Sequence, residues 1–221
     1  MTRLSPFLAL ALGACAFAPS GGPLRLPAPS NFLALHGGVP GFIEGYGSAT
    51  IIAPGIAATA AHEAGTMLTG FHTRYAKDKD LAFFDARDGA PLVAGSPHLG
   101  DYVTVYGNSY ASGPRVAHGR VIVEVIGMCA GEVVTGDDGG PAAKECARRG
   151  LGMRAGFVID APTGAGMSGG PVISNGQWIG ITTQRTIIDT GPYAGQEGAF
   201  VYYAGTVLVS ARESGASNDS K

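Results

Sequence analysis

The chain of 221 residues contains little charge and only three cysteines. Charged residues make up 14% of it and the formal net charge is −2, so nothing points to a nucleic-acid surface. We find neither an internal repeat nor coiled-coil heptads. The long apolar run near the N-terminus, "PFLALALGACAFA", is too short to span a bilayer. Glycine and proline are abundant, with 36 and 14 residues, and they predict many turns between short elements.

The composition suits a folded domain. Hydrophobic residues make up 45% of the chain, enough for a sizeable core in one compact domain or in two small, closely packed ones. We expect this folded body to cover residues 33–211. Residues 15–32 are rich in Pro, Gly and Ser and predict a flexible tether, and the polar residues 212–221 predict a disordered tail.

The N-terminus has the pattern of an export signal. Arg3 precedes the apolar run, which is the order of the n-region and h-region of a secretory signal. The stretch Leu12–Cys15, "LGAC", resembles the lipobox of bacterial lipoproteins, whose signal is cut before a cysteine that then carries lipid. The resemblance implies a signal peptide over residues 1–14 and a lipidated Cys15. It also implies anchoring to a membrane of the bacterial cell envelope, on the periplasmic side in a Gram-negative cell. An ordinary signal peptide with a coincidental cysteine is the alternative.

Export makes the two remaining cysteines interpretable. We expect Cys129 and Cys146 to pair as a disulfide in an oxidising compartment. A bridge closing a loop of this size contributes about 3 kcal/mol to stability. Two free thiols are the alternative, whereas the spacing of His and Cys does not fit a metal site.

The folded body is predicted to consist mainly of short strands. Residues 47–54 and 55–62 form two apolar runs joined by a Pro-Gly turn, and residues 169–174 and 178–184 flank an Asn-Gly turn. The stretch 198–211, "GAFVYYAGTVLVSA", is expected to be the last strand segment, and only 141–150 is typical of a helix. Strands about ten residues apart favour an all-β sandwich or barrel.

Three residues form a candidate catalytic set. Ser168 lies in "TGAGMSGGPV", where glycines allow a sharp turn that would expose a nucleophile beside backbone N–H groups. An idle serine in a glycine-rich hairpin is the alternative. A serine nucleophile needs a base and the base needs an orienting carboxylate, and His62 in "ATAAHEAG" and Asp80 in "KDKDLAFFD" supply those chemistries. We expect His62 at the end of a strand and Asp80 at the start of another.

The motifs "TAAH", "DLA" and "SGGP" occur in the order found in trypsin/chymotrypsin-like serine peptidases. The chain resembles the bacterial HtrA type most, over nearly all of residues 40–210. The resemblance implies two antiparallel six-stranded β-barrels, about residues 40–108 and 114–210, with the active site between them. It implies an endopeptidase that forms an acyl-enzyme on polypeptide substrates, with His62 and Asp80 from the first barrel and Ser168 from the second. We predict no cofactor, metal or nucleic acid.

The same resemblance assigns the remaining parts of the site. The N–H groups of Gly166 and Ser168 would form the oxyanion hole. The substrate pocket would be lined by residues near Pro162, Thr182, Thr183, Gln184 and Ala199. None of these is acidic, so we expect small or medium uncharged side chains before the cleaved bond, although Asp160 could overturn this preference.

The sequence departs from the family in three respects. Met167 stands where trypsin has an acidic residue, so we expect the Ser168 loop to be held by packing and backbone hydrogen bonds alone, without a newly made N-terminus. The short separation of His62 and Asp80 implies a trimmed first barrel and leaves Asp78 and Asp85 as alternative acids. We also expect no peptide-binding module after the second barrel, unlike in the HtrA type.

Two other functions remain open. A catalytically silent module of this fold could bind peptides by adding a strand without cutting them. A serine esterase would use the same three residues.

Overall fold

The structure is a computed structural model, and it describes residues 22–23, 28–39, 43–68, 70–76, 79–87, 89–90, 92–110, 112–125, 127–129, 132–134, 156–188 and 191–216. Four predictions lie outside these residues: the signal peptide, the lipidation of Cys15, the helix at 141–150 and the alternative acid Asp78. The predicted disulfide also falls outside them, because neither Cys146 nor the side chain of Cys129 is described. In the described part of the chain, no helix is long and apolar enough to cross a membrane.

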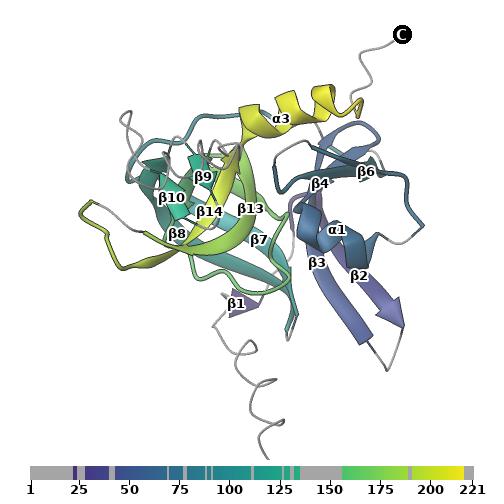
Figure 1. Cartoon of the computed structure of the whole chain (residues 1–221), viewed down its shortest axis with the longest axis horizontal. Helices are drawn as coiled ribbons and strands as arrows, with labels where there is room; N and C mark the ends of the chain where they lie inside the picture. The colour runs from purple at the N-terminus through teal and green to yellow at the C-terminus, as the bar shows by residue number, and fades with distance from the viewer. Residues whose placement is uncertain are drawn as a thin grey trace, which may run out of the picture.

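Six strands form a closed antiparallel barrel in the C-terminal half of the chain (Figure 1). They are β7 (Tyr102–Ser109), β8 (Gly113–Val125), β11 (Gly156–Ile159), β12 (Pro171–Ser174), β13 (Gln177–Ile187) and β14 (Glu197–Tyr203). The order is β8-β11-β14-β13-β12-β7, and pairing of β7 with β8 closes the ring. Residues two apart on a strand, such as Val103 and Val105, are fully buried and fill the interior.

Three short strands lie outside this ring. β1 (Gly22–Pro23) pairs with β8. β9 (Gly127–Cys129) and β10 (Glu132–Val134) pair with each other as a separate two-stranded ribbon.

The N-terminal part of the body is an antiparallel five-stranded sheet, called the first sheet below. Its order is β2-β3-β4-β6-β5. The strands are β2 (Phe32–Val39), β3 (Ile43–Ala53), β4 (Ile56–Thr59), β5 (Thr73–Tyr75) and β6 (Ala82–Asp85). In the described residues this unit has five strands where six were predicted. Its edge strands, β2 and β5, are not paired with each other, so this sheet does not close into a barrel as the second unit does. A trimmed first unit agrees with the short His62–Asp80 separation.

The boundary between the two units also differs from the prediction, which placed it near residue 108. β7 pairs with β12 and β8 and therefore belongs to the barrel. β2 precedes residue 40 and belongs to the first sheet. The predicted Pro-Gly hairpin is present as β3 and β4, and the Asn-Gly hairpin as β12 and β13.

Two helices replace segments that were expected to be strands. α1 (Ala61–Met67) begins just after β4, so His62 lies in the first turn of a helix rather than at a strand end. α3 (Ala204–Glu213) follows β14 directly, and the strand expected through residue 211 is wrong beyond Tyr203. Ala204, Val207 and Ala211 are buried at spacings of three and four residues, which is the helical period. Ala216 is itself buried, so residues 212–216 do not belong to the predicted disordered tail.

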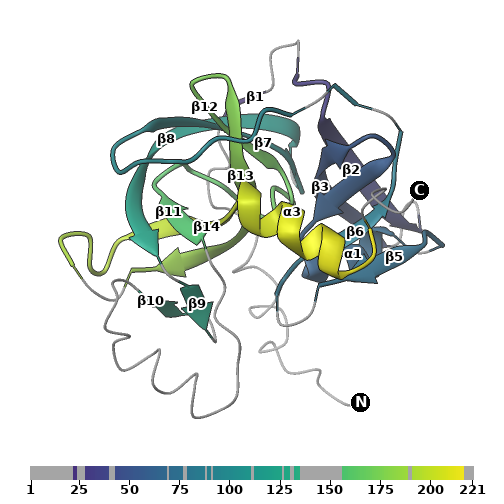
Figure 2. The same cartoon turned by 90° about the horizontal axis from the view of Figure 1, so that it is seen from above.

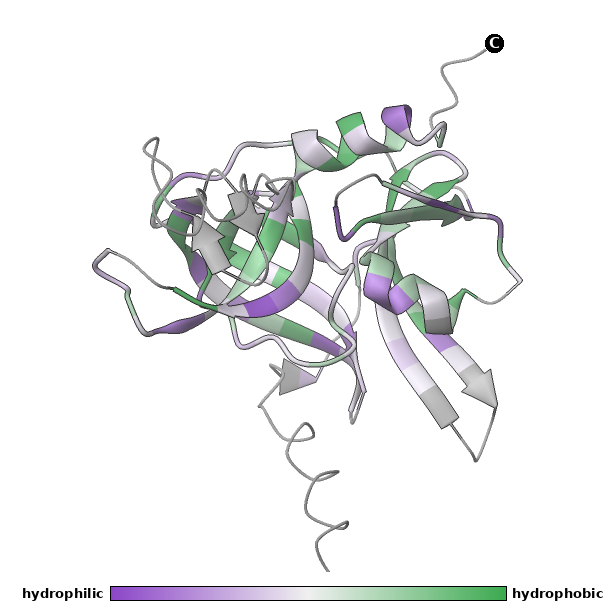
Figure 3. Cartoon of the chain, in the orientation of Figure 1, coloured by the Kyte–Doolittle hydropathy of each residue, from purple (hydrophilic) through white to green (hydrophobic). Residues whose placement is uncertain are grey.

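One apolar core joins the two units. Leu81 and Phe83 of the first unit pack in the same cluster as Phe200 and Tyr202 of the barrel and Val207 of α3. In Figure 2, α3 runs across the junction between the first sheet and the barrel. Figure 3 shows hydrophobic residues along the strands of both units, as expected for two sheets that each enclose apolar side chains.

Candidate active site

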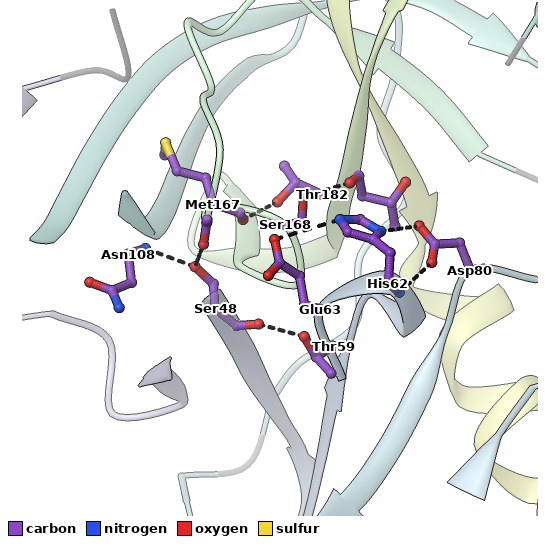
Figure 4. Close-up of polar contacts among 11 residues, drawn as sticks. Ser48, Thr59, His62, Glu63, Asp80, Asn108, Met167, Ser168 and Thr182 are labelled. Carbon is purple, nitrogen blue, oxygen red and sulfur yellow. Dashed lines mark hydrogen bonds and ion pairs between the residues drawn. The ribbon is translucent and has the colours of Figure 1, made fainter. Parts of the chain in front are cut away.

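Asp80 and His62 are brought together by two hydrogen bonds. The His62 backbone N–H donates to Asp80 Oδ1 at 3.0 Å, and His62 Nδ1 lies 2.7 Å from Asp80 Oδ2 (Figure 4). The Asp80 side chain is 11% exposed and that of His62 is 48% exposed. Asp80 lies in the turn before β6, and β6 pairs with β4, the strand that leads into α1. This register sets the carboxylate beside the first turn of α1 and fixes the orientation of the imidazole.

The other candidate acids are placed differently. Asp85 is exposed and pairs with Arg74 on β5, with Nη1 and Oδ1 3.1 Å apart. It lies opposite Ile56, at the far end of β4 from His62. Of the two candidate acids that the structure describes, Asp80 is thus the one that contacts the imidazole.

A tyrosine of the barrel contacts the backbone of Asp80. The Asp80 backbone N–H donates to the Tyr202 hydroxyl at 3.0 Å, across the junction between the two units. Tyr202 is completely buried on β14. Sequence reasoning missed this residue, because the motif "VYY" reads simply as strand. Only the packing of the two units shows which tyrosine reaches Asp80.

The Ser168 loop turns sharply at two glycines, as its sequence predicts. Gly166 and Gly169 have φ values of +86° and +87°, a conformation that L side chains rarely adopt. A Cβ on Gly169 would collide with the Ser48 carbonyl and the Thr59 hydroxyl. The Ser48 N–H donates to the Ser168 carbonyl at 3.2 Å. The loop of the barrel therefore lies directly against β3 and β4, next to the start of α1.

Buried hydroxyl groups hold this loop in place. The Ser48 hydroxyl donates to the Gly166 carbonyl at 2.7 Å, and that of Thr50 donates to the Gly169 carbonyl at 2.9 Å. The Thr182 hydroxyl donates to the Met167 carbonyl at 2.7 Å. The expectation that packing and backbone hydrogen bonds alone hold the loop is therefore wrong, because three side chains contribute.

Met167 packs as the sequence predicts. Its side chain is fully buried in the barrel core, pressed against Gly107 of β7 where a Cβ would collide with it. A thioether in this position carries no charge and fills apolar space under the loop.

The hydroxyl of Ser168 is bonded to the barrel rather than to His62. Ser168 Oγ donates to the Thr183 carbonyl on β13 at 2.6 Å, at a point where the β13–β14 register shifts. The other imidazole nitrogen, Nε2, lies 3.5 Å from Glu63 Oε1. Figure 4 shows Glu63 and Asp80 on different sides of the His62 ring. The structure thus assembles the His62–Asp80 pair and sets the Ser168 loop beside it, with the serine hydroxyl turned away.

Two carboxylates favour the charged imidazole. The hydrogen bond with Asp80 is the largest cause, and the one with Glu63 the next, that raise the pKa of His62 from 6.5 to about 9, although desolvation opposes them. In this arrangement His62 is an imidazolium at neutral pH.

The remaining predicted site residues surround the loop. In the described part of the chain, the N–H groups of Gly166 and Ser168 donate to no backbone carbonyl, and Gly166 is buried whereas Ser168 is half-buried. The hydroxyl of Thr183, a buried residue, lies 3.5 Å from the Phe200 carbonyl. Pro162 is exposed.

Two further predicted pocket residues, Thr182 and Ala199, are also buried, and Gln184 is half-buried. Thr182 is buried with its hydroxyl on the loop, and Ala199 lies in the barrel core beside Gln184 and Arg185 of β13. Asp160 accepts a hydrogen bond from the Arg120 N–H at 2.6 Å, which engages one of its carboxylate oxygens.

Comparisons with solved structures give the fold. The active form of the Rv3671c protease from M. tuberculosis is 22% identical, with a TM-score of 0.59, covering 98% of this chain and 96% of that chain. The MamO protease domain from Magnetospirillum magneticum is 19% identical, with a TM-score of 0.56, covering 82% and 95%. The HtrA-type protease AlgW with a tripeptide is 19% identical, with a TM-score of 0.56, covering 86% of this chain and 61% of that chain.

Neither a known family model nor a curated protein sequence matches the chain. The structural likeness is nevertheless consistent across these proteases. The chain has the fold of HtrA-type, trypsin-like serine proteases: an antiparallel six-stranded barrel packed against a second β unit.

Proposed function

We propose that this chain is an exported, lipid-anchored serine endopeptidase with Ser168 as nucleophile, His62 as general base and Asp80 as orienting carboxylate. The observation that carries the proposal is the double hydrogen bond from His62 to Asp80, beside a glycine-turned serine loop on the neighbouring barrel. The lipobox-like "LGAC" supports export and lipidation at Cys15. AlgW has been solved with a tripeptide and with a decapeptide, which supports a polypeptide substrate here.

Catalysis begins with a rotation of the Ser168 side chain from the Thr183 carbonyl toward His62 Nε2. The serine oxygen then attacks the peptide carbonyl carbon while its proton passes to neutral His62. The oxyanion accepts hydrogen bonds from the N–H groups of Gly166 and Ser168. His62 returns the proton to the leaving amine as the C–N bond breaks, and an acyl-enzyme remains. Water, deprotonated by His62, releases the acid and restores Ser168.

The pocket before the cleaved bond would take uncharged side chains. Thr182, Thr183 and Ala199 offer no charge to compensate a lysine or an arginine, and one carboxylate oxygen of Asp160 is already bonded to β8.

A silent binding module is the second candidate. The Ser168 hydroxyl on Thr183 and the Glu63 carboxylate on His62 Nε2 are the observations that favour it. An active-site-directed fluorophosphonate separates the two, because an enzyme labels on Ser168 and a binder does not. Comparison of peptide with ester turnover separates a peptidase from an esterase.

We expect Ser168→Ala and His62→Ala to lose turnover by orders of magnitude and to remain folded, because triad members act as a unit. Asp80→Asn should cost about ten-thousand-fold, through loss of the correct imidazole tautomer. The matched control is Asp85→Asn, which changes an exposed carboxylate at the far end of β6 and should keep wild-type activity. Peptide hydrolysis with circular dichroism measures both properties. Either alanine variant retaining a tenth of the activity would refute the assignment.

A further inference from the structure

Glu63 lies beside His62 Nε2, the nitrogen that accepts the Ser168 proton in the proposed mechanism. Its side chain is only 12% exposed, and its Oε1 is 3.5 Å from His62 Nε2. Asp80 already holds Nδ1, so Nε2 is the nitrogen left for Ser168. The Glu63 carboxylate therefore occupies the approach by which the serine hydroxyl would reach the imidazole.

Turnover requires Glu63 to give up this contact. A carboxylate with so little exposure is poorly hydrated, so loss of the contact with the imidazolium costs free energy that a cation of the substrate can offset. A lysine or arginine side chain of the substrate could take the place of the imidazolium beside Glu63 when the substrate binds. Binding such a group would draw Glu63 away from His62 and leave Nε2 free.

The position of Glu63 fixes which part of a substrate it would meet. Its Oε2 is 3.3 Å from the point that a Cβ at Gly47 would occupy, so the carboxylate lies against β3. The Ser168 loop lies between β3 and β13: the Ser48 N–H donates to the Ser168 carbonyl, and the Gly169 N–H donates to the Thr182 carbonyl at 2.6 Å. The proposed pocket for the residue before the cleaved bond is on the β13 side. With that pocket on the β13 side, the departing part of the substrate would leave on the opposite, β3 side.

We propose that Glu63 is a specificity-determining residue that binds the lysine or arginine side chain of the residue directly after the cleaved bond. This inference rests on the proposed endopeptidase function. It implies that the enzyme prefers an uncharged residue before the cleaved bond and a cationic residue after it.

The test compares two matched peptides that differ only in Arg or Ala directly after the cleaved bond. We expect kcat/KM of the wild-type protein to be about tenfold higher for the Arg peptide, the size of one charge-assisted contact. In Glu63→Gln the ratio should fall to about one. The pH dependence of kcat/KM reports the free enzyme, which is the same for both peptides. The protonation state of His62 therefore cancels from the ratio of the two kcat/KM values. Asp85→Asn is the matched control and should keep the wild-type ratio.

A second measurement needs no variant. A peptide with citrulline, a neutral analogue of arginine, should be cut by the wild type at the rate of the Ala peptide. An unchanged Arg-to-Ala ratio in Glu63→Gln, or equal cleavage of the Arg and citrulline peptides, overturns the role of Glu63 while endopeptidase activity stands. A wild-type protein that cuts none of these peptides and takes no fluorophosphonate overturns the proposed function, and the role of Glu63 falls with it.

Discussion

At the scale of single residues, the charge on His62 decides what the site can do. The imidazole must be neutral to take a proton from Ser168, but the carboxylates of Asp80 and Glu63 both stabilise its protonated form. Asp80 also orients the imidazole, because its two carboxylate oxygens bind the backbone N–H and the ring Nδ1 of His62. The Glu63 carboxylate contacts the other ring nitrogen and also raises the pKa of His62, so it helps to keep the base charged in the free protein.

This leads to a prediction for the dependence of activity on pH. The pKa of His62 is raised to about 9, so kcat/KM should rise with pH as His62 loses its proton, with a midpoint near that value. Glu63→Gln removes the second-largest cause of the shift, so its midpoint should move to lower pH. The pH–rate profiles of the two proteins with one neutral peptide measure this. Identical midpoints would mean that Glu63 does not act on His62 in solution.

At the scale of secondary-structure elements, the site depends on contacts between segments far apart in the chain. The Ser48 and Thr50 hydroxyls of β3 hold carbonyls of the Ser168 loop, and Tyr202 of β14 accepts the Asp80 N–H. The nucleophile loop and the His62–Asp80 pair are thus each positioned by the opposite unit. Correct docking of the first sheet on the barrel is therefore a condition for assembling the site.

Tyr202→Phe tests this dependence. Removing the hydroxyl leaves the Asp80 N–H without that acceptor, which costs about 1–3 kcal/mol in a buried position. We expect kcat to fall about tenfold or more with KM little changed, because Tyr202 positions Asp80 and does not contact the substrate. Tyr203→Phe is the control, since Tyr203 is the next residue of β14 and its ring packs on Phe157. Equal kcat in both variants would show that Tyr202 serves only packing.

At the scale of the whole molecule, the body couples two β units through one shared core and α3. Leu81 and Phe83 share that core with Phe200 and Val207, so unfolding of one unit exposes apolar surface of the other. We therefore expect the body to unfold in one transition. The predicted lipid anchor at Cys15 and the predicted Cys129–Cys146 disulfide lie outside the described residues of this body.

Mass spectrometry of the native protein tests both features. We expect a mature chain that begins at a lipid-modified Cys15, and a Cys129–Cys146 disulfide that resists alkylation until it is reduced. Loss of the bridge should lower stability by about 3 kcal/mol, measured by denaturant unfolding with and without reductant. An unmodified Cys15 in the mature chain, or two thiols that alkylate without reduction, would count against these assignments.

The sequence determined the chemistry of the site and most of its strands. Serine, histidine and aspartate in recognisable local motifs, and glycines at positions 166 and 169, are visible without coordinates, because each motif reflects a local backbone requirement. The sequence favours a strand through residue 211 because "TVLVSA" is rich in β-branched residues. The apolar spacing of three and four residues between Ala204, Val207 and Ala211 is the sequence signal that indicates the helix instead.

The way in which these parts meet depends on the packing of the two units. The Asp80–Tyr202 and Ser48–Gly166 hydrogen bonds join residues 122 and 118 positions apart. No local pattern encodes such pairs, because they depend on how the first sheet docks on the barrel. The same holds for Glu63: the sequence places it next to His62, but only the turn of α1 against β3 aims its carboxylate at Nε2. The sequence motifs thus identify the candidate reacting groups, whereas packing between the two units sets which side chains contact them.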